Sequence, residues 1–202
     1  MADEAHLLAL TKGQWFIPIL AEMRESGGTR LAPLLHRLGI SPPMARRSLA
    51  AMIEAGWIMR NPGHGHPLRP EYLLTEMGRA LAPHCQHVLE ARRALGQPIT
   101  GAGRWHLPLI AALSHEDQRF GDLASKLSPV TPRALSLALK KGVAIGHVER
   151  AVEPSYPPIT SYGLANRARD LVAAVRPLAG TLIRPARALR PDSPATAFPR
   201  AG

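Results

Sequence analysis

Apolar residues recur at helical spacing along the chain, and glycines and prolines separate the segments. Leu7 to Met23 is mostly apolar and predicts a helix, in which Pro18 is tolerable only as a kink or near a first turn. Gly27-Gly28 ends this helix. Arg30 to Leu38 has leucines at helical spacing and predicts a short amphipathic helix, which Gly39 closes as a C-terminal glycine does.

A third helix follows almost at once. Ser41 is a natural N-cap, and Pro42 takes the first helical position, where its missing N–H costs nothing. The helix runs to about Ala55, and Gly56 closes it. Its predicted core face consists of Ala45, Leu49, Met52 and Ile53. A short helix, a tight turn and a capped helix together predict a helix-turn-helix.

A β-hairpin and a long helix complete the pattern. Trp57 to Arg60 predicts a strand, Asn61 to Pro70 a loop, and Glu71 to Leu74 the returning strand. Thr75 caps a last helix, which runs to about Leu95. A hairpin behind a helix-turn-helix is a wing. The predicted fold class is therefore mainly α with small β-hairpins (α+β), as a winged helix-turn-helix.

The whole pattern occurs twice, with an offset of 90 residues. The segment GQWFIPI at 13–19 returns as GRWHLPL at 103–109, and Pro42 and Gly56 match Pro132 and Gly146. Ordered matches over some 70 positions indicate an internal duplication. The predicted domains are a first unit at 4–95, a linker at 96–102, a diverged second unit at 103–183, and a disordered Pro/Arg/Ala-rich tail at 184–202.

Charge and composition narrow the possible partners. The net charge is +10, of which residues 1–90 carry +1 and residues 91–202 carry +9. A basic surface attracts polyanions, although charge alone does not separate nucleic acid from acidic lipid. The apolar runs are too short to span a bilayer, the N-terminus has no export signal, and the single Cys85 cannot form an internal disulfide. We expect no membrane association and a cytoplasmic, nucleoid-associated protein.

The segments GQWFIPIL, LGISPPMARRSLAAMIEAGWIMR and EYLLTEMGRALAP resemble the HxlR family of bacterial winged-helix regulators. The resemblance covers residues 12–90 well and 102–177 more loosely. It implies a sequence-specific DNA-binding protein whose terminal helices build a dimer. The chain departs from the family in two respects: it lacks the usual cysteine upstream of the GxW segment, and it carries two such domains. Thiol-based sensing is therefore not transferred.

In the first unit, the predicted outward side of the recognition helix carries Pro43, Met44, Arg47 and Ala51, with Arg46 at its flank. Arg47 is therefore the best candidate to reach a guanine edge and Arg46 a phosphate. Ser41 and the nearby N–H groups suit a phosphate at the helix N-terminus. The predicted DNA-binding residues of this unit are Ser41, Pro43, Met44, Arg46, Arg47, His64, His66 and Arg69, the last three from the wing.

The second unit has lost part of this set. Leu137 replaces Arg47 and Ser136 replaces Arg46, while Val143 joins Leu135 and Leu139 as predicted core. The predicted DNA-binding residues are Thr131, Arg133, Ser136, Lys140 and Lys141. We therefore expect the second unit mainly to contact the DNA backbone.

The sequence predicts a transcriptional regulator that is not an enzyme and needs no cofactor and no metal. Its partner is double-stranded DNA, with RNA polymerase or another regulator as a further partner. The helix from Thr75 should pack near that from Leu164, which gives a monomeric pseudo-dimer; a homodimer stays open. The alternative is a winged-helix protein-interaction module in which the second unit is the docking surface.

Overall fold

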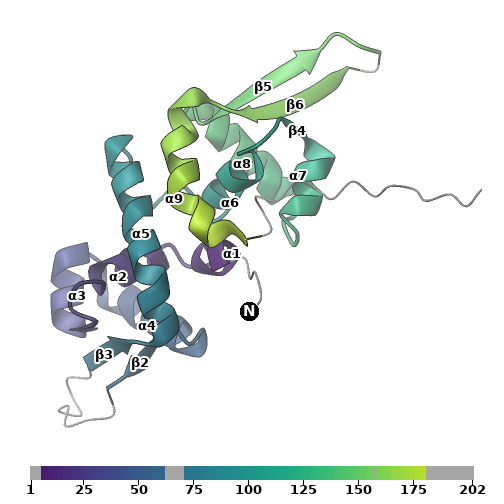
Figure 1. Cartoon of the computed structure of the whole chain (residues 1–202). Coiled ribbons are helices and arrows are strands. Elements are labelled where there is room, and N and C mark those ends of the chain that lie inside the picture. The colour runs from purple at the N-terminus through teal and green to yellow at the C-terminus, as the bar shows by residue number, and fades with distance from the viewer. Residues whose placement is uncertain (1–5, 62–70, 157, 181–202) are drawn as a thin grey trace, which may run out of the picture.

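The structure, a computed structural model, describes residues 6–61, 71–156 and 158–180. Apart from an extra helix at the start of the first unit and a 3₁₀ turn in the second, both units share one succession of elements, with helices and antiparallel strands mixed as predicted (Figure 1). The first comprises α1 (His6–Leu10), α2 (Phe16–Glu22), β1 (Gly28–Arg30), α3 (Leu31–Leu38), α4 (Pro42–Glu54), β2 (Ile58–Arg60), β3 (Glu71–Leu74) and α5 (Glu76–Ala94). The second comprises α6 (His106–Ala112), β4 (Gln118–Arg119), α7 (Phe120–Lys126), α8 (Pro132–Ala144), β5 (Val148–Glu153), β6 (Ile159–Leu164), the 3₁₀ turn η1 (Asn166–Ala168) and α9 (Arg169–Ala179).

The N-terminal segment differs from its prediction. It forms two helices, α1 and α2, instead of one continuous helix over 7–23, and Pro18 lies in the first turn of α2. At that place the missing N–H of proline breaks no helical hydrogen bond. The short α1 packs against α6 and α9, which belong to the second unit. The start of the chain therefore helps to join the two units.

Each sheet has three strands, one more than the predicted hairpin. The order is β1-β3-β2 in the first unit and β4-β6-β5 in the second, all antiparallel. The extra strands are short, with Thr29 opposite Tyr72 in one sheet and Gln118 opposite Tyr162 in the other. They fix the N-terminal ends of α3 and α7 to the wings, so that each helix-turn-helix is held to its own sheet.

The two units are joined by their long helices. As predicted, α5 packs along α9, and the two lie side by side at the centre of Figure 1 with the wings at opposite ends of the molecule. One continuous apolar core contains residues of both units, among them Ile19, Leu81, Leu109 and Leu171. Within the described residues, no helix is both long and apolar enough to cross a bilayer. The chain is built as an intramolecular pair of similar halves.

Candidate nucleic-acid interface

The turn before α4 is set by the residues that the sequence singled out. Gly39 adopts the left-handed conformation (φ 61°) at the end of α3, and α4 begins at Pro42 after an extended Ser41. Ser41 thus holds the N-cap position, but within the described structure its side chain makes no capping hydrogen bond. Pro42 and Pro43 have no N–H, and the N–H of Ala45 donates to the carbonyl of Ser41. Within the described residues, the Ser41 hydroxyl and the N–H of Met44 are therefore the donors left for an anion at this end of α4.

The two sides of α4 separate cleanly. Ala45, Ser48, Leu49 and Met52 are buried against the core. The exposed residues of the helix are Pro42, Pro43, Arg46, Arg47, Ala50 and Glu54. Arg46 and Arg47 lie on opposite flanks of Ala50, and neither forms an ion pair within the described residues. Both guanidinium groups are therefore available to an external partner.

Met44 lies less openly than its neighbours on α4. It is half-buried and, together with Arg47 and Ala51, lines a cleft of about 510 Å³ whose other wall is Lys12 to Phe16. The outward face of α4 is thus centred on Pro43 and Ala50, whereas the sequence placed Met44 and Ala51 on it. A role of Met44 at DNA stays a prediction.

The second recognition helix has a better cap and a different surface. Thr131 Oγ1 accepts a hydrogen bond from the N–H of Ala134 at 3.2 Å. Arg133, Ser136 and Lys140 are exposed, and Leu137 is 59% exposed. Lys141 donates from Nζ to the carbonyl of Gly101 at 2.5 Å, so this side chain is held against the segment that joins the units.

One predicted core residue of the second unit is misplaced. Val143 is 41% exposed, and Gly142 is buried in its stead. A Cβ on Gly142 would lie 2.7 Å from Cγ2 of Val148. The helix α8 therefore packs directly on β5 at this glycine, and the glycine serves close packing at the expense of helix propensity.

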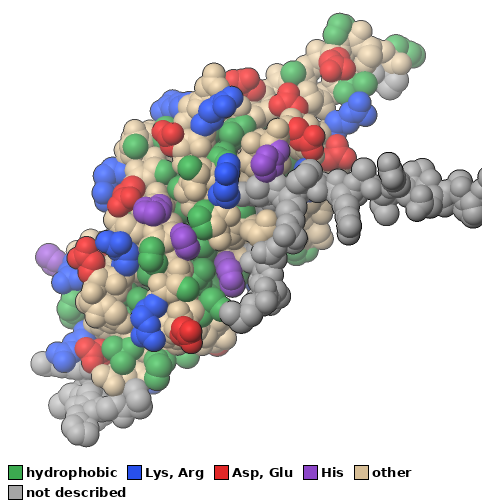
Figure 2. All heavy atoms as spheres, viewed as in Figure 1, with side chains coloured by type: hydrophobic (Ala, Val, Ile, Leu, Met, Phe, Trp, Pro, Cys, Tyr) green, Lys and Arg blue, Asp and Glu red, His purple; other side chains and the backbone are tan. Residues whose placement is uncertain are grey.

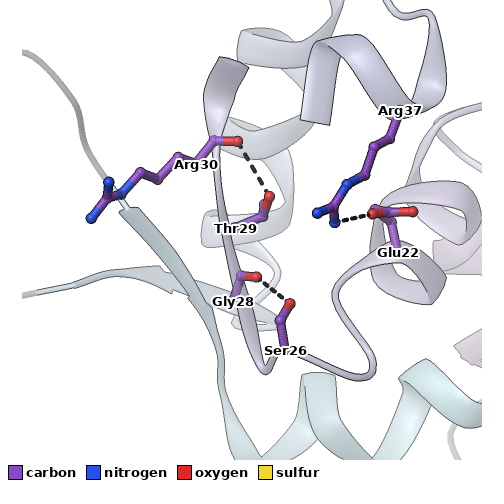
Figure 3. Close-up of polar contacts among 6 residues, drawn as sticks. All are labelled: Glu22, Ser26, Gly28, Thr29, Arg30 and Arg37. Carbon is purple, nitrogen blue, oxygen red and sulfur yellow. Dashed lines mark hydrogen bonds and ion pairs between the residues drawn. The ribbon is translucent and has the colours of Figure 1, made fainter. Parts of the chain in front are cut away.

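Arginines at the start and end of α3 have different roles (Figure 3). Arg37 donates to Glu22 at 2.6 Å and is turned toward α2. Arg30, just before α3, points away from the polar contacts of Ser26 and Thr29 and is exposed. Arg30 was not among the residues predicted to bind DNA. The repeat carries a signal for it, because Arg119 stands at the matching place before α7 and is exposed as well.

The two wings differ in the length of their described strands. β2 and β3 span three and four residues, whereas β5 and β6 span six each. The predicted wing residues His64, His66 and Arg69 lie outside the described residues. The second wing presents Glu149, Arg150 and Glu153 to solvent, together with a fully exposed Tyr156. Its mixed charge is poorly suited to phosphate.

The face that carries α5 and α9 mixes both signs of charge. Figure 2 shows Lys and Arg interspersed with Asp and Glu across it, with histidines between them.

The single thiol, Cys85, is buried in α5, and burial raises its pKa to about 12. A protonated, buried thiol is a poor nucleophile, so the structure gives Cys85 a packing role.

A pair of histidines is buried in the second unit. His106, at the start of α6, and His147, after α8, are linked by a 3.1 Å hydrogen bond between Nε2 and Nδ1. Gln97 contacts Nε2 of His147 at 2.9 Å. Burial, with smaller effects of the positive charges of Arg92 and Lys141 and of the neighbouring His147, lowers the pKa of His106 to about 3. Burial and the charges of Arg167 and Arg92 also lower the pKa of His147, so both rings are neutral at pH 7.

The three-stranded sheets, the short turn before a capped helix and the wings define both halves as winged helix-turn-helix domains. The family model described as HxlR-like helix-turn-helix matches the chain twice, over residues 10–97 and 101–182. The chain belongs to this family of helix-turn-helix transcriptional regulators, in a tandem form.

Two further comparisons are narrower. An uncharacterised HTH-type transcriptional regulator of Halalkalibacterium halodurans is 35% identical over 78 residues, which cover 38% of this chain and 68% of that protein. A crystal structure assigned to a MarR-family transcriptional regulator of Enterococcus faecalis is 27% identical and covers 44% of this chain and 76% of that one. Its TM-score of 0.37 reflects a partial superposition.

Proposed function

We propose that the chain is a sequence-specific DNA-binding transcriptional regulator that supplies both halves of its DNA-binding surface. The observation that carries this proposal is the pair of exposed guanidinium groups of Arg46 and Arg47 on α4, which form no ion pair with any described residue. An exposed helix with such groups fits the major groove, where base edges differ in their donors and acceptors. The tandem membership of a regulator family supports the same role.

The first unit reads bases in this proposal. Arg47 gives its two-pronged donor to a guanine, and Arg46 pairs with a phosphate. The Ser41 hydroxyl and the N–H of Met44 at the start of α4 bind a second phosphate, which fixes the register of the helix. The exposed Arg30 before α3 adds a contact to the same strand.

The second unit mainly holds the backbone. Its helix presents Arg133 and Lys140, which attract phosphates of any sequence, while the position of Arg47 is taken by the apolar Leu137. Lys141 is the weakest of these candidates because its ammonium group already has the carbonyl of Gly101 as a partner. The role is non-enzymatic, at the nucleoid, with RNA polymerase or another regulator as the protein partner.

A second function is favoured by the apolar surface of the second unit. Leu137 and Val143 are exposed on α8, and Val152 is exposed on the wing beside it. Exposed apolar side chains on neighbouring elements suit a protein partner. Under this alternative the second unit is a docking module and contacts no phosphate.

The test compares matched substitutions on the two recognition helices. Arg47→Ala should cost about 1–3 kcal/mol at the cognate site and relax the preference at one base position. Arg133→Ala should weaken cognate and random DNA alike and reduce the salt dependence of binding. Leu137→Ala, at the position that matches Arg47, is the control and should leave the motif unchanged.

The outcomes separate the two functions. Equal effects of Arg47→Ala on cognate and random DNA would contradict base reading by α4. No effect of Arg133→Ala on any DNA, together with loss of a protein partner in Leu137→Ala, would assign the second unit to docking.

A further inference from the structure

A cleft of about 260 Å³ lies where the two units meet. Its walls are the turns that precede α2 and α6, so positions related by the repeat face the same space: Gly13 with Gly103, Gln14 with Arg104, and Ile17 with Leu107. The segment Ile99 to Ala102 and the last turn of α5 complete the wall. A molecule in this cleft would contact both units at once.

Arg92, in the last turn of α5, lines the cleft and is only 7% exposed. Its Nη1 donates to the carbonyl of Ile99 at 2.9 Å, but within the described residues its Nε is buried without an acceptor. No described carboxylate pairs with this guanidinium. A buried charge without a counter-ion is strongly unfavourable, and a bound anion would offset that cost.

The other residues that line the cleft supply further positive charge and apolar surface. Lys12 and Arg104 contribute two further positive charges, and none of the described residues that line the cleft is acidic. Ile17 and the partly exposed Ile99 give apolar surface beside these cations. Burial lowers the pKa of Arg92, as expected for a cation that lacks a counter-charge.

We propose that this cleft binds a small organic monocarboxylate, with the carboxylate on Arg92 and the hydrocarbon part against Ile17 and the partly exposed Ile99. A guanidinium recognises a carboxylate through charge-assisted hydrogen bonds. The apolar surface favours a ligand with a short alkyl chain or one ring over inorganic anions. The site is independent of the proposed DNA binding.

The test uses the full chain and titration calorimetry with hexanoate and benzoate as probes. The uncharged matched probes are hexanamide and benzamide, which keep the shape and remove the charge. We expect saturable binding of at least one acid, and binding of its amide weaker by about tenfold or more. Arg92→Gln should lose about the same factor, whereas Arg93→Gln, an exposed arginine one position along α5, should bind like the wild type.

Three results would contradict the proposal that this cleft binds a monocarboxylate. These are no binding of either acid at millimolar concentration to the folded wild-type chain, equal binding of acid and amide, and unchanged affinity in Arg92→Gln. If Arg92→Gln does not fold, as judged by circular dichroism, Arg92→Lys takes its place. It keeps the charge without the planar, forked donors of the guanidinium and should still weaken binding of the acid relative to Arg93→Gln.

Discussion

At one pair of matching positions, the two units pack through different side chains: two aromatic rings in the first unit and two histidines in the second. In the first, Phe16 and Trp57 meet edge to face, with ring centroids 5.6 Å apart and planes at 77°. At the matching positions of the second, His106 and His147 lie 5.2 Å apart at 35° and share a hydrogen bond. We call this contact, between the start of α2 or α6 and the segment that follows the recognition helix, the joint of each unit. The joint is apolar in the first unit and polar in the second.

The difference teaches what each joint requires. An aromatic pair needs only close packing, because its stabilisation comes from burial and ring geometry. A buried histidine pair needs every donor and acceptor partnered, yet within the described residues Nδ1 of His106 has no partner. The joint of the second unit is therefore less stabilising, and it is sensitive to protons.

The largest expected difference is in the free energy of unfolding. Trp57→Ala removes a side chain that is 4% exposed and should cost about 3–5 kcal/mol. His147→Ala leaves His106 and Gln97 without a partner and should cost about 1–3 kcal/mol. Guanidinium denaturation at pH 7.5, followed by circular dichroism, measures both. An equal or greater loss in His147→Ala would contradict this ranking of the joints.

The second prediction concerns acid. Below pH 6.5 the unfolded chain protonates His106, whereas the folded chain does not until about pH 3. Stability from this group is thus fully present above pH 6.5 and is lost as the pH falls toward 3. The slope is about 1.4 kcal/mol per pH unit for each extra proton bound by the unfolded chain.

The double variant His106→Phe/His147→Trp rebuilds the aromatic pair of the first unit and should flatten this slope, measured by denaturation between pH 7.5 and 5. The control His115→Phe removes an exposed histidine and should keep the wild-type slope. An unchanged slope in the double variant would show that the acid sensitivity arises elsewhere.

The smallest expected effect concerns a glycine. Met52 is buried in α4, but the matching residue of α8 is Gly142, against which Val148 packs. Gly142→Ala should destabilise the chain by about 1–3 kcal/mol, less the gain in helix propensity, because the stiff Val148 must move.

Gly121, in α7, is the matched control, because a Cβ added there would meet only open space. Gly121→Ala should therefore stabilise the chain by about 0.5–1 kcal/mol through helix propensity. Thermal denaturation of both variants gives the comparison. A stabilising Gly142→Ala would contradict the close approach of α8 and β5.

Local chemistry made much of the fold predictable. The proline that starts each recognition helix, Gly39 in its left-handed conformation and the capping Thr75 act within a few residues, and the structure has them as predicted. The pairing of α5 with α9 followed from the repeat together with the family resemblance, which implies a dimer built by terminal helices. By contrast, β1 and β4 pair with strands some 40 residues away, and two or three residues carry no periodic signal.

The details of the second unit were harder to predict because its helical pattern was assumed to follow that of the first. Val143 was expected in the core since Ile53 stands at its place, but in both helices the preceding residue is the buried one: Ile53 is only partly buried beside Met52, and Val143 is exposed beside Gly142. The histidine pair could have been predicted from the sequence, because both members of the aromatic pair of the first unit are replaced by histidine in the repeat. No local signal indicates that Arg92 is buried, since its neighbour Arg93 is exposed.

The central claim is that one chain supplies two unequal DNA-binding halves. The most direct measurement is selection of bound sites from genomic fragments, combined with the mass of the complex on the selected DNA. We predict one chain per site, with two parts about 34 Å apart, one rich in sequence information and one nearly indifferent. A perfect palindrome that binds two chains, with a first unit on each half, would contradict the claim.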